Sequence, residues 1–172
     1  MYWKAIPCHN EAIRPAQLIT NRTMTQSSNS LVQSLLKPSV TENMGLQVTM
    51  LVVRVTVGLL MIHNGIDKLG DVQGFADNVV SFIGLPFPVF FTYVAAYVEI
   101  ISSGLLVVGL LTRANAVALL GTMAVAIFFH LKGDGFHIPP LETASLYALI
   151  YLFFAVFGAG RLSVDEAIAD KL

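Results

Sequence analysis

Four long apolar stretches constrain this chain more than any other feature of its sequence. They cover residues 46–66, 87–111, 114–131 and 141–160, and the only formally charged residues inside them are Arg54, Glu99 and Glu142. A helix needs about 20 apolar residues to cross ~30 Å of hydrocarbon. A soluble bundle would need polar faces at the helical period, and residues 114–131 offer none before His130. The sequence therefore predicts an all-α integral membrane four-helix bundle.

Charge and cysteine content exclude several classes of function. Only 12 % of the 172 residues are charged, against about a quarter in soluble domains. The formal net charge of −1 provides no basic field for a nucleic acid, so the expected partner is the lipid bilayer. The single cysteine, Cys8, excludes an intramolecular disulfide, a dithiol redox pair and a multi-cysteine zinc or iron–sulfur site within one chain. We expect no metal site.

The first 45 residues differ in character from the rest. They are polar, lack the apolar core of a secretory signal peptide and predict a flexible cytoplasmic extension ahead of a membrane domain at residues 46–172. Seven Lys and Arg residues lie in this extension, in the turn after the second stretch and at the C-terminus, whereas two lie on the other side. This asymmetry predicts that both termini are cytoplasmic, with the plasma membrane as the default location.

Two short helices are expected outside the spans. Between the first two stretches, Phe75, Val79, Phe82 and Ile83 form one apolar stripe. Such a stripe predicts a short helix lying on the outer membrane interface, and a lid packed over the mouth of the bundle fits the pattern equally well. After the fourth stretch, the Ser163-Val-Asp-Glu166 sequence matches a capping box and predicts a short cytoplasmic helix.

The deep charges should lie inside the bundle. Glu99 is 12 residues into the second stretch, roughly 18 Å from its outer end. The positions three and four residues away from it are all small: Ala95, Ala96, Ser102 and Ser103. Small residues allow close packing of another helix, so this face should be buried. Arg54 lies at the same calculated depth, and we therefore predict an Arg54–Glu99 ion pair.

Further polar residues are expected around the outer mouth of the bundle. On the first helix, Gly58, Met61, Gly65 and Lys68 share the inward face of Arg54. Small residues at four-residue steps in the third stretch (Ala114, Ala118, Thr122 and Ala126) predict a packed face that ends at His130. Together with His137 and Glu142, Lys68 and His130 would surround one mouth. The alternatives are a solvated loop position for His137 and interfacial snorkelling for His130 and Glu142.

Two other patterns are weaker. Tyr147 and Tyr151 are one turn apart, a spacing that favours packing over a quinone platform. His63 and His130 approach one depth, but no other haem signature accompanies them, so haem is not expected. His63 falls on the opposite side of its helix from Arg54 and is best interpreted as an interfacial imidazole.

Several short segments occur in a characteristic order and spacing over about residues 46–168. They are Arg54-x-x-x-Gly58, Gly65-x-x-Lys68, residues 84–86, 95–99 and 109–113, His130 and residues 158–165. In the order and spacing of these segments the chain resembles the DoxX family of small four-span membrane proteins. The resemblance implies a four-helix membrane fold and an association with redox chemistry, including quinone-linked sulfur oxidation. The chain has no nucleotide-binding glycine motif and no self-contained redox centre. The electron donor would therefore be a protein partner.

Three functions remain open from sequence. The first is a membrane subunit or accessory of an oxidoreductase, with Lys68, His130 and Glu142 holding a quinone headgroup or a small polar substrate. Arg54 and Glu99 would then be structural or complete a proton path. The second is a small proton-coupled transporter in which Glu99 titrates, for which four helices form a narrow pathway unless the protein is a homo-oligomer. The third is a non-catalytic scaffold or assembly subunit.

Overall fold

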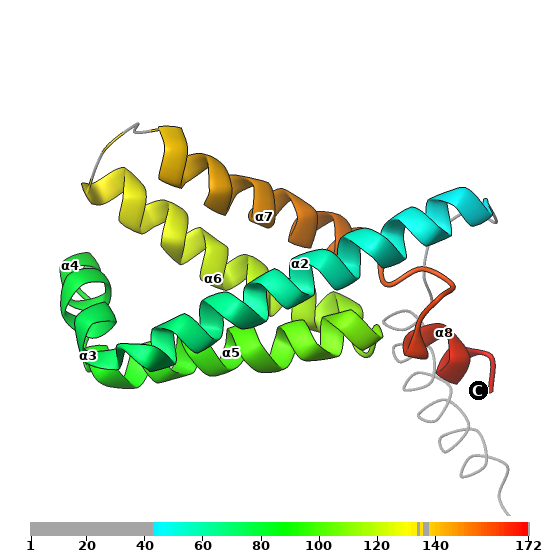
Figure 1. Ribbon diagram of the computed structural model, residues 1–172, viewed down its shortest axis with the longest axis horizontal. Helices are drawn as coiled ribbons and strands as arrows, with labels where there is room; N and C mark the ends of the chain where they lie inside the picture. The colour runs from blue at the N-terminus through cyan, green and yellow to red at the C-terminus, as the bar shows by residue number, and fades with distance from the viewer. Residues whose placement is uncertain (1–42, 134, 136–137, 172) are drawn as a thin grey trace, which may run out of the picture. The chain divides into compact units, whose positions relative to one another are not determined.

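The computed structural model describes residues 43–133, 135 and 138–171, and every regular element in these ranges is helical. The long helices are α2 (Met44–Gly70), α5 (Pro88–Val108), α6 (Thr112–Gly133) and α7 (Ile138–Phe157) (Figure 1). The short elements are α3 (Val72–Phe75), the π-helical turn η1 (Ala76–Val80), α4 (Ser81–Ile83) and α8 (Val164–Ala169). Both expected short helices and all four expected long ones are present. The predicted N-terminal extension lies almost entirely outside the described residues.

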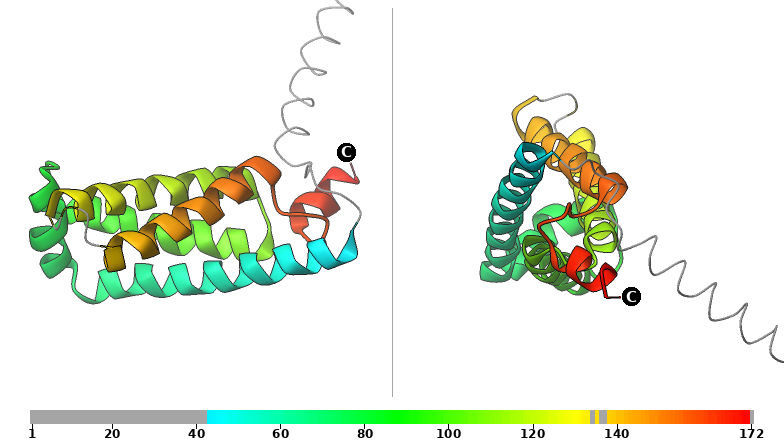
Figure 2. Two further views of the ribbon diagram at one scale, coloured as in Figure 1. Left: turned by 90° about the horizontal axis from the view of Figure 1, so that it is seen from above. Right: turned by 90° about the vertical axis from the view of Figure 1, so that its right-hand side faces the viewer.

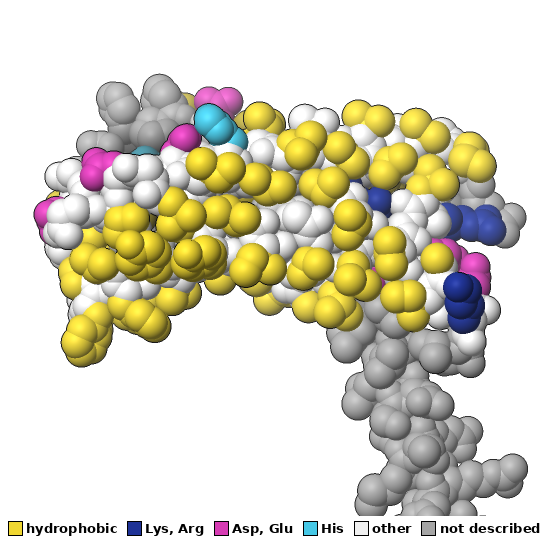
Figure 3. Space-filling model, turned by 60° about the horizontal axis from the view of Figure 1, so that its bottom comes forward, with side chains coloured by type: hydrophobic (Ala, Val, Ile, Leu, Met, Phe, Trp, Pro, Cys, Tyr) yellow, Lys and Arg dark blue, Asp and Glu magenta, His cyan; other side chains and the backbone are white. Residues whose placement is uncertain are grey.

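The length and composition of these helices suit a membrane. Helices α2, α5 and α6 are long and apolar enough to cross one, and Leu141–Phe157 of α7 is a fourth, shorter apolar helix. Large apolar side chains remain exposed along the bundle. Figure 3 shows one such face, covered by apolar side chains with charged side chains gathered toward its two ends. An exposed apolar surface of this extent is stable in lipid and unstable in water.

Local sequence signals set the helix ends. The Asn43 side chain accepts hydrogen bonds from the amides of Gly45 and Leu46 and caps α2. Pro88 occupies the first turn of α5, where a missing amide hydrogen costs nothing. Helix α5 ends at Gly109, whose positive φ of 74° allows Leu110 N–H and Gly109 N–H to bond back to Leu105 O and Leu106 O.

The bundle consists of two closely packed pairs, α2 with α5 and α6 with α7 (Figure 2). Two glycines of α2 make the first pair close. A Cβ added at Gly58 would lie 2.5 Å from Val107, and one at Gly65 would lie 2.9 Å from the carbonyl oxygen of Ala96. The predicted inward face of α2 is thus confirmed: Arg54, Gly58, Met61 and Gly65 are all buried.

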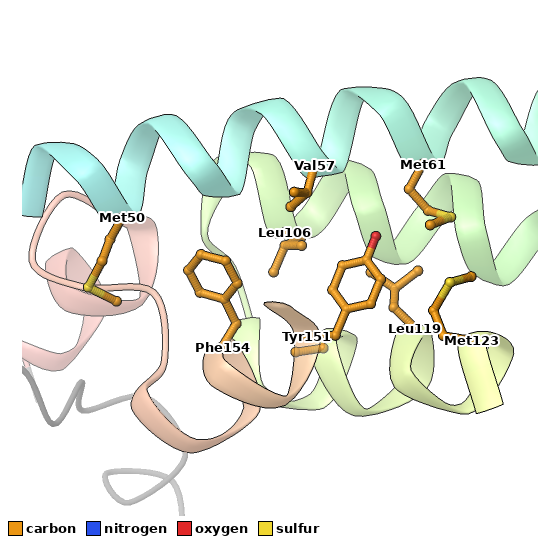
Figure 4. Close-up of a cluster of buried hydrophobic side chains, with 9 residues drawn as sticks. Met50, Val57, Met61, Leu106, Leu119, Met123, Tyr151 and Phe154 are labelled. Atoms are coloured by element: carbon orange, nitrogen blue, oxygen red, sulfur yellow. The ribbon is translucent and has the colours of Figure 1, made fainter. Parts of the chain in front are cut away.

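A hydrophobic cluster joins the two pairs in the middle of the bundle. Met50, Val57 and Met61 of α2 face Tyr151 and Phe154 of α7, and Leu106, Ala116, Leu119 and Met123 complete the cluster from α5 and α6 (Figure 4). Tyr151 and Phe154 are fully buried. This filled cross-section divides the bundle into two ends that carry different side chains.

Candidate functional site

A cavity of about 690 Å³ occupies the end of the bundle beneath α3, η1 and α4. All four long helices contribute to its wall, which is mainly apolar, and its polar lining residues are Asn64, Lys68, Glu99, Thr122, His130, Thr143 and Tyr147. The volume lies in the range of about 300–1,000 Å³ that is typical of small-molecule sites. Phe75, Val79 and Ile83 of the predicted apolar stripe line the cavity from above. The short helical segment therefore packs as a lid over the mouth.

A buried ion pair lies in the wall of this cavity. Lys68 Nζ of α2 is 2.6 Å from Glu99 Oε2 of α5, and the two side chains are 16 % and 2 % exposed. The lysine also donates to the carbonyl oxygen of Asn64 at 3.4 Å and lies 5.2 Å from the centre of the Phe75 ring. Glu99 is thus buried against α2 as predicted, on a face whose neighbours Ala96, Ser102 and Ser103 are also buried.

His130 of α6 lines the cavity, and its Nδ1 atom is buried without a hydrogen-bond partner in the structure. The stripe that leads to it has a different role from the predicted one. Ala118, Thr122 and Ala126 line the cavity, whereas α6 packs through another face made of Thr112, Asn115, Ala116, Leu119 and Met123. The expectation of a packed face was therefore wrong. These small side chains leave a space unfilled.

The two tyrosines of α7 lie at different levels of the site. Tyr147 lines the cavity, and its ring stacks on that of Tyr151 at 6.1 Å between centroids. Tyr151 belongs to the buried cluster that closes the inner end of the cavity, with its hydroxyl directed toward α2 (Figure 4). The interpretation of Tyr151 as a packing residue is confirmed, whereas Tyr147 is part of the site.

The predicted Arg54–Glu99 pair was wrong. Arg54 instead donates to the carbonyl oxygens of Ala159 at 2.7 Å and Leu162 at 2.8 Å, at the opposite end of the bundle from the cavity. A Cβ at Gly109 would lie 2.6 Å from Arg54 Nη1, so Arg54 is level with Gly109, ten residues or ~15 Å along α5 from Glu99. The predicted depths of Arg54 and Glu99 were counted from the ends of their spans, on the assumption that these ends lie at the same level. Helix α2, however, has 27 residues and α5 has 21, so equal counts do not give equal depths.

Sequence reasoning missed the anion that accompanies Arg54. Asp165 is 1 % exposed, accepts hydrogen bonds from the amides of Leu111 at 2.7 Å and Thr112 at 2.9 Å, and acts electrostatically on Arg54. It also donates through its own amide to Gly109 O. These hydrogen bonds join residues 109–112, between α5 and α6, to residues 159–165, at the start of α8. We call these two segments the clasp. The sequence predicted no role for the Asp165 carboxylate and placed the residue only in a matching segment and in the capping-box sequence, in which Ser163 Oγ accepts a hydrogen bond from Glu166 N–H. The sequence signal for the second role of Asp165, capping α6, was that this helix begins without a capping residue of its own.

The remaining candidate residues lie away from the cavity. Glu142 of α7 is exposed and does not line it, so the structure does not bring Glu142 together with Lys68 and His130. His63 is exposed and lies 3.5 Å from Asp67, outside the cavity that His130 lines, as expected for an interfacial imidazole. His137 lies outside the described residues.

These features define a class: a small all-α integral membrane protein with a charge pair buried beside an internal cavity. The DoxX family model matches residues 49–131. An uncharacterized membrane protein of Mycobacterium tuberculosis is 31 % identical over 133 residues, which are 69 % of this chain and 80 % of the relative. The chain belongs to the DoxX family.

A second relative matches more strongly over a shorter region. It is an uncharacterized protein of Haemophilus influenzae, 41 % identical over 83 residues, or 45 % of this chain and 62 % of the relative. The match thus spans less than two thirds of that protein. No solved structure matches the chain.

Proposed function

We propose that this protein binds a lipid-soluble molecule with a polar, redox-active headgroup, a quinone in the first instance, and acts as a membrane subunit or accessory of an oxidoreductase system. The observation that carries the proposal is the mainly apolar cavity of about 690 Å³ with Lys68, Glu99 and His130 in its wall. An apolar site with a few polar groups is the usual form of a site for such ligands. The resemblance to DoxX proteins, some of which are linked to quinone chemistry, supports the same class.

The polar groups suit a headgroup that exchanges protons. Glu99 Oε2 accepts a hydrogen bond from Lys68, and the buried Nδ1 atom of His130 has no hydrogen-bond partner among the described residues. An imidazole can take up or release a proton near neutral pH. Because the chain offers no flavin or nicotinamide motif, electrons would come from a partner protein. That partner, the cell membrane location and the cytoplasmic orientation of both termini belong to this proposal.

The transporter alternative is less well supported. A proton-coupled pathway through Glu99 would have to continue from the cavity to the clasp, but Met61, Leu119 and Tyr151 are buried in the cluster that fills the bundle between them. This arrangement favours binding at one end over passage through the protein. The scaffold alternative leaves the buried ion pair and the cavity without a role.

Quinone binding tests the proposal directly. The protein is purified in mild detergent, extracted for bound quinone, and titrated with ubiquinone and menaquinone analogues while its melting temperature is followed. A ligand that binds only the folded state raises stability by about 2.7 kcal/mol at a concentration of 100 times Kd. We expect the Kd for the analogues to rise at least tenfold in Glu99→Gln and His130→Ala and to stay unchanged in Asp170→Asn, whose exposed side chain lines neither pocket. Absence of extractable quinone together with no thermal shift for any analogue would overturn the proposal.

A further inference from the structure

The cavity wall formed by α5 and α6 is apolar and reaches the outer surface of the bundle. Val94 of α5 and Val125 of α6 both line the cavity, yet they are 40 % and 45 % exposed. Gly121 of α6 also lines it and is exposed. A side chain that belongs to both the cavity and the outer surface lies at an opening. The cavity therefore opens sideways between these two helices.

The geometry of the two helices explains this opening. Helix α5 packs against α2 at Ala96 and Ser103, and its cavity-lining face carries Phe91, Ala95 and Val98. Helix α6 packs on α7 through one face and turns its small residues Ala118, Gly121 and Ala126 to the cavity. The small residues Ala95, Ala118 and Gly121 leave a gap between the two helices.

The end of the bundle, in contrast, is covered. Lys132 Nζ at the end of α6 donates to the carbonyl oxygen of Phe82 in α4 at 2.8 Å. The Phe82 and Phe129 rings contact edge to face at 5.7 Å between centroids. These contacts fasten the lid to α6 above the cavity. A ligand therefore finds less obstruction from the side than through the lid.

The polar end of the cavity lies beside Lys68. A second pocket of about 390 Å³ shares Asn64, Lys68, Phe75 and Val79 with the cavity and is otherwise lined by polar residues that include Asp67, Asp71 and Asn78. Charged and polar groups are thus concentrated where α2 meets Glu99 of α5, whereas the α5 and α6 walls are otherwise mainly apolar, with Thr122 and His130 as their other polar side chains. A molecule that matches this gradient has a polar head and a hydrocarbon tail.

We propose that the gap between α5 and α6 is a lateral portal to the bilayer, and that the ligand carries a long hydrocarbon or isoprenoid tail that leaves through it. The head lies near Lys68, Glu99 and His130, and the tail passes between Val94 and Val125 into lipid. The identity of the head rests on the function proposed above. The portal specifies a tailed ligand from the membrane and not a small water-soluble one.

Portal-narrowing variants test this assignment. Nothing lies within 4 Å of a Cβ built at Gly121, so Gly121→Leu should fold, and Ala118→Leu provides a second variant. Ala114→Leu is the matched control, because Ala114 lies on the same stripe, is exposed and does not line the cavity. Binding is measured for ubiquinone without a side chain and for ubiquinone with a decyl chain. We expect the two portal variants to bind the decyl form at least tenfold more weakly and the tail-less form as the wild type does. Equal affinity of wild type and both portal variants for the decyl form would overturn the portal.

A second measurement does not depend on the headgroup. The wild-type protein in phosphatidylcholine vesicles is irradiated with a diazirine-labelled fatty acid, and labelled residues are identified by mass spectrometry. Label on the cavity-lining residues Val98 or Thr122 supports the portal, and label confined to outward residues such as Val117 overturns it. If these inner residues are labelled but no quinone binds, the proposed function fails and the portal stands. If quinone binds but neither narrowing nor labelling shows an effect, the portal fails alone.

Discussion

Buried charges are balanced separately at the two ends of the molecule. Lys68 forms an ion pair with Glu99 at the cavity, and Asp165 interacts electrostatically with Arg54 at the clasp. In both cases the cation lies on α2 and the anion comes from another part of the chain. A buried charge without a partner is costly, so each end depends on its own partner residue.

At the cavity end, we expect Glu99→Ala to destabilise the protein. The substitution leaves the Lys68 ammonium, 16 % exposed, without its carboxylate partner, and breaking a buried pair from one side costs about 3 kcal/mol. The free energy of unfolding in mixed detergent micelles measures the effect. Asp67→Ala is the matched control, since Asp67 is exposed. A Glu99→Ala protein as stable as the control would show that the pair contributes nothing to folding.

At the clasp, Asp165→Ala should cost at least about 2 kcal/mol of stability. It removes the acceptor of the Leu111 and Thr112 amides, and each buried donor left unsatisfied costs about 1–3 kcal/mol. Asp170→Ala, an exposed position just after the same short helix, should stay within about 0.5 kcal/mol of the wild type. Unfolding of the two variants under identical detergent conditions makes the comparison. Equal stability would mean that α6 does not depend on this cap.

At the scale of the helix, the α2–α5 pair depends on two glycines, Gly58 and Gly65, at which neighbouring atoms of α5 would lie closer than 3 Å to an added Cβ. A third helical glycine, Gly104 of α5, has nothing within 4 Å of an added Cβ. The three positions therefore separate the effect of packing from the general effect of glycine in a helix. They also provide an internal control for any helix substitution in this protein.

Gly65→Ala should destabilise the protein by about 1–3 kcal/mol, because the new methyl would meet the Ala96 carbonyl oxygen at 2.9 Å and the helices must separate. Gly104→Ala should instead stabilise it by about 0.5–1 kcal/mol, since alanine restricts the unfolded chain and meets no neighbour. Unfolding free energies of the two variants are compared directly. A Gly65→Ala protein that gains stability would contradict the close contact.

The existence of the helices and the buried faces of α2 and α5 were predictable from this sequence, whereas the alignment of the helices along their axes was not. Runs of apolar residues identify spans because lipid excludes charge, and the inward face containing Gly58 and Gly65 follows from the helical period. The partner of Arg54 depends on how far α2 slides along α5, and the sequence contains no direct signal of that offset. The stripe on α6 was misread for a related reason: small residues allow close contact and also leave cavities, and only the neighbouring helices decide which.

On the scale of the whole described bundle, the two ends differ in structure. One end is hollow and covered by a lid, and the other is sealed by the clasp, in which Gln47 Oε1 accepts from the Arg161 amide at 2.7 Å. The start of α2 and the segment before α8 therefore meet at the same end. This arrangement agrees with an even number of spans and leaves the absolute orientation to experiment.

Cysteine labelling of intact cells tests the orientation predicted from the Lys and Arg distribution. Cys8 is the single cysteine of the sequence and should react with a membrane-impermeant maleimide only after permeabilisation. In a Cys8→Ser background, Gln73→Cys places a thiol at an exposed position of α3 and should react without permeabilisation. The reverse pattern would place both termini outside and would move the lid to the cytoplasmic face.

The filled cross-section at Met61, Leu119 and Tyr151 has a kinetic consequence. Because the cavity is closed at its inner end, a bound molecule cannot pass through to the clasp and must leave on the side of the bundle from which the next one enters. If the oxidised and reduced forms of one carrier both bind in this cavity, they cannot be bound at the same time. In an enzyme that works through this cavity, the spent carrier would therefore inhibit competitively with respect to the fresh one.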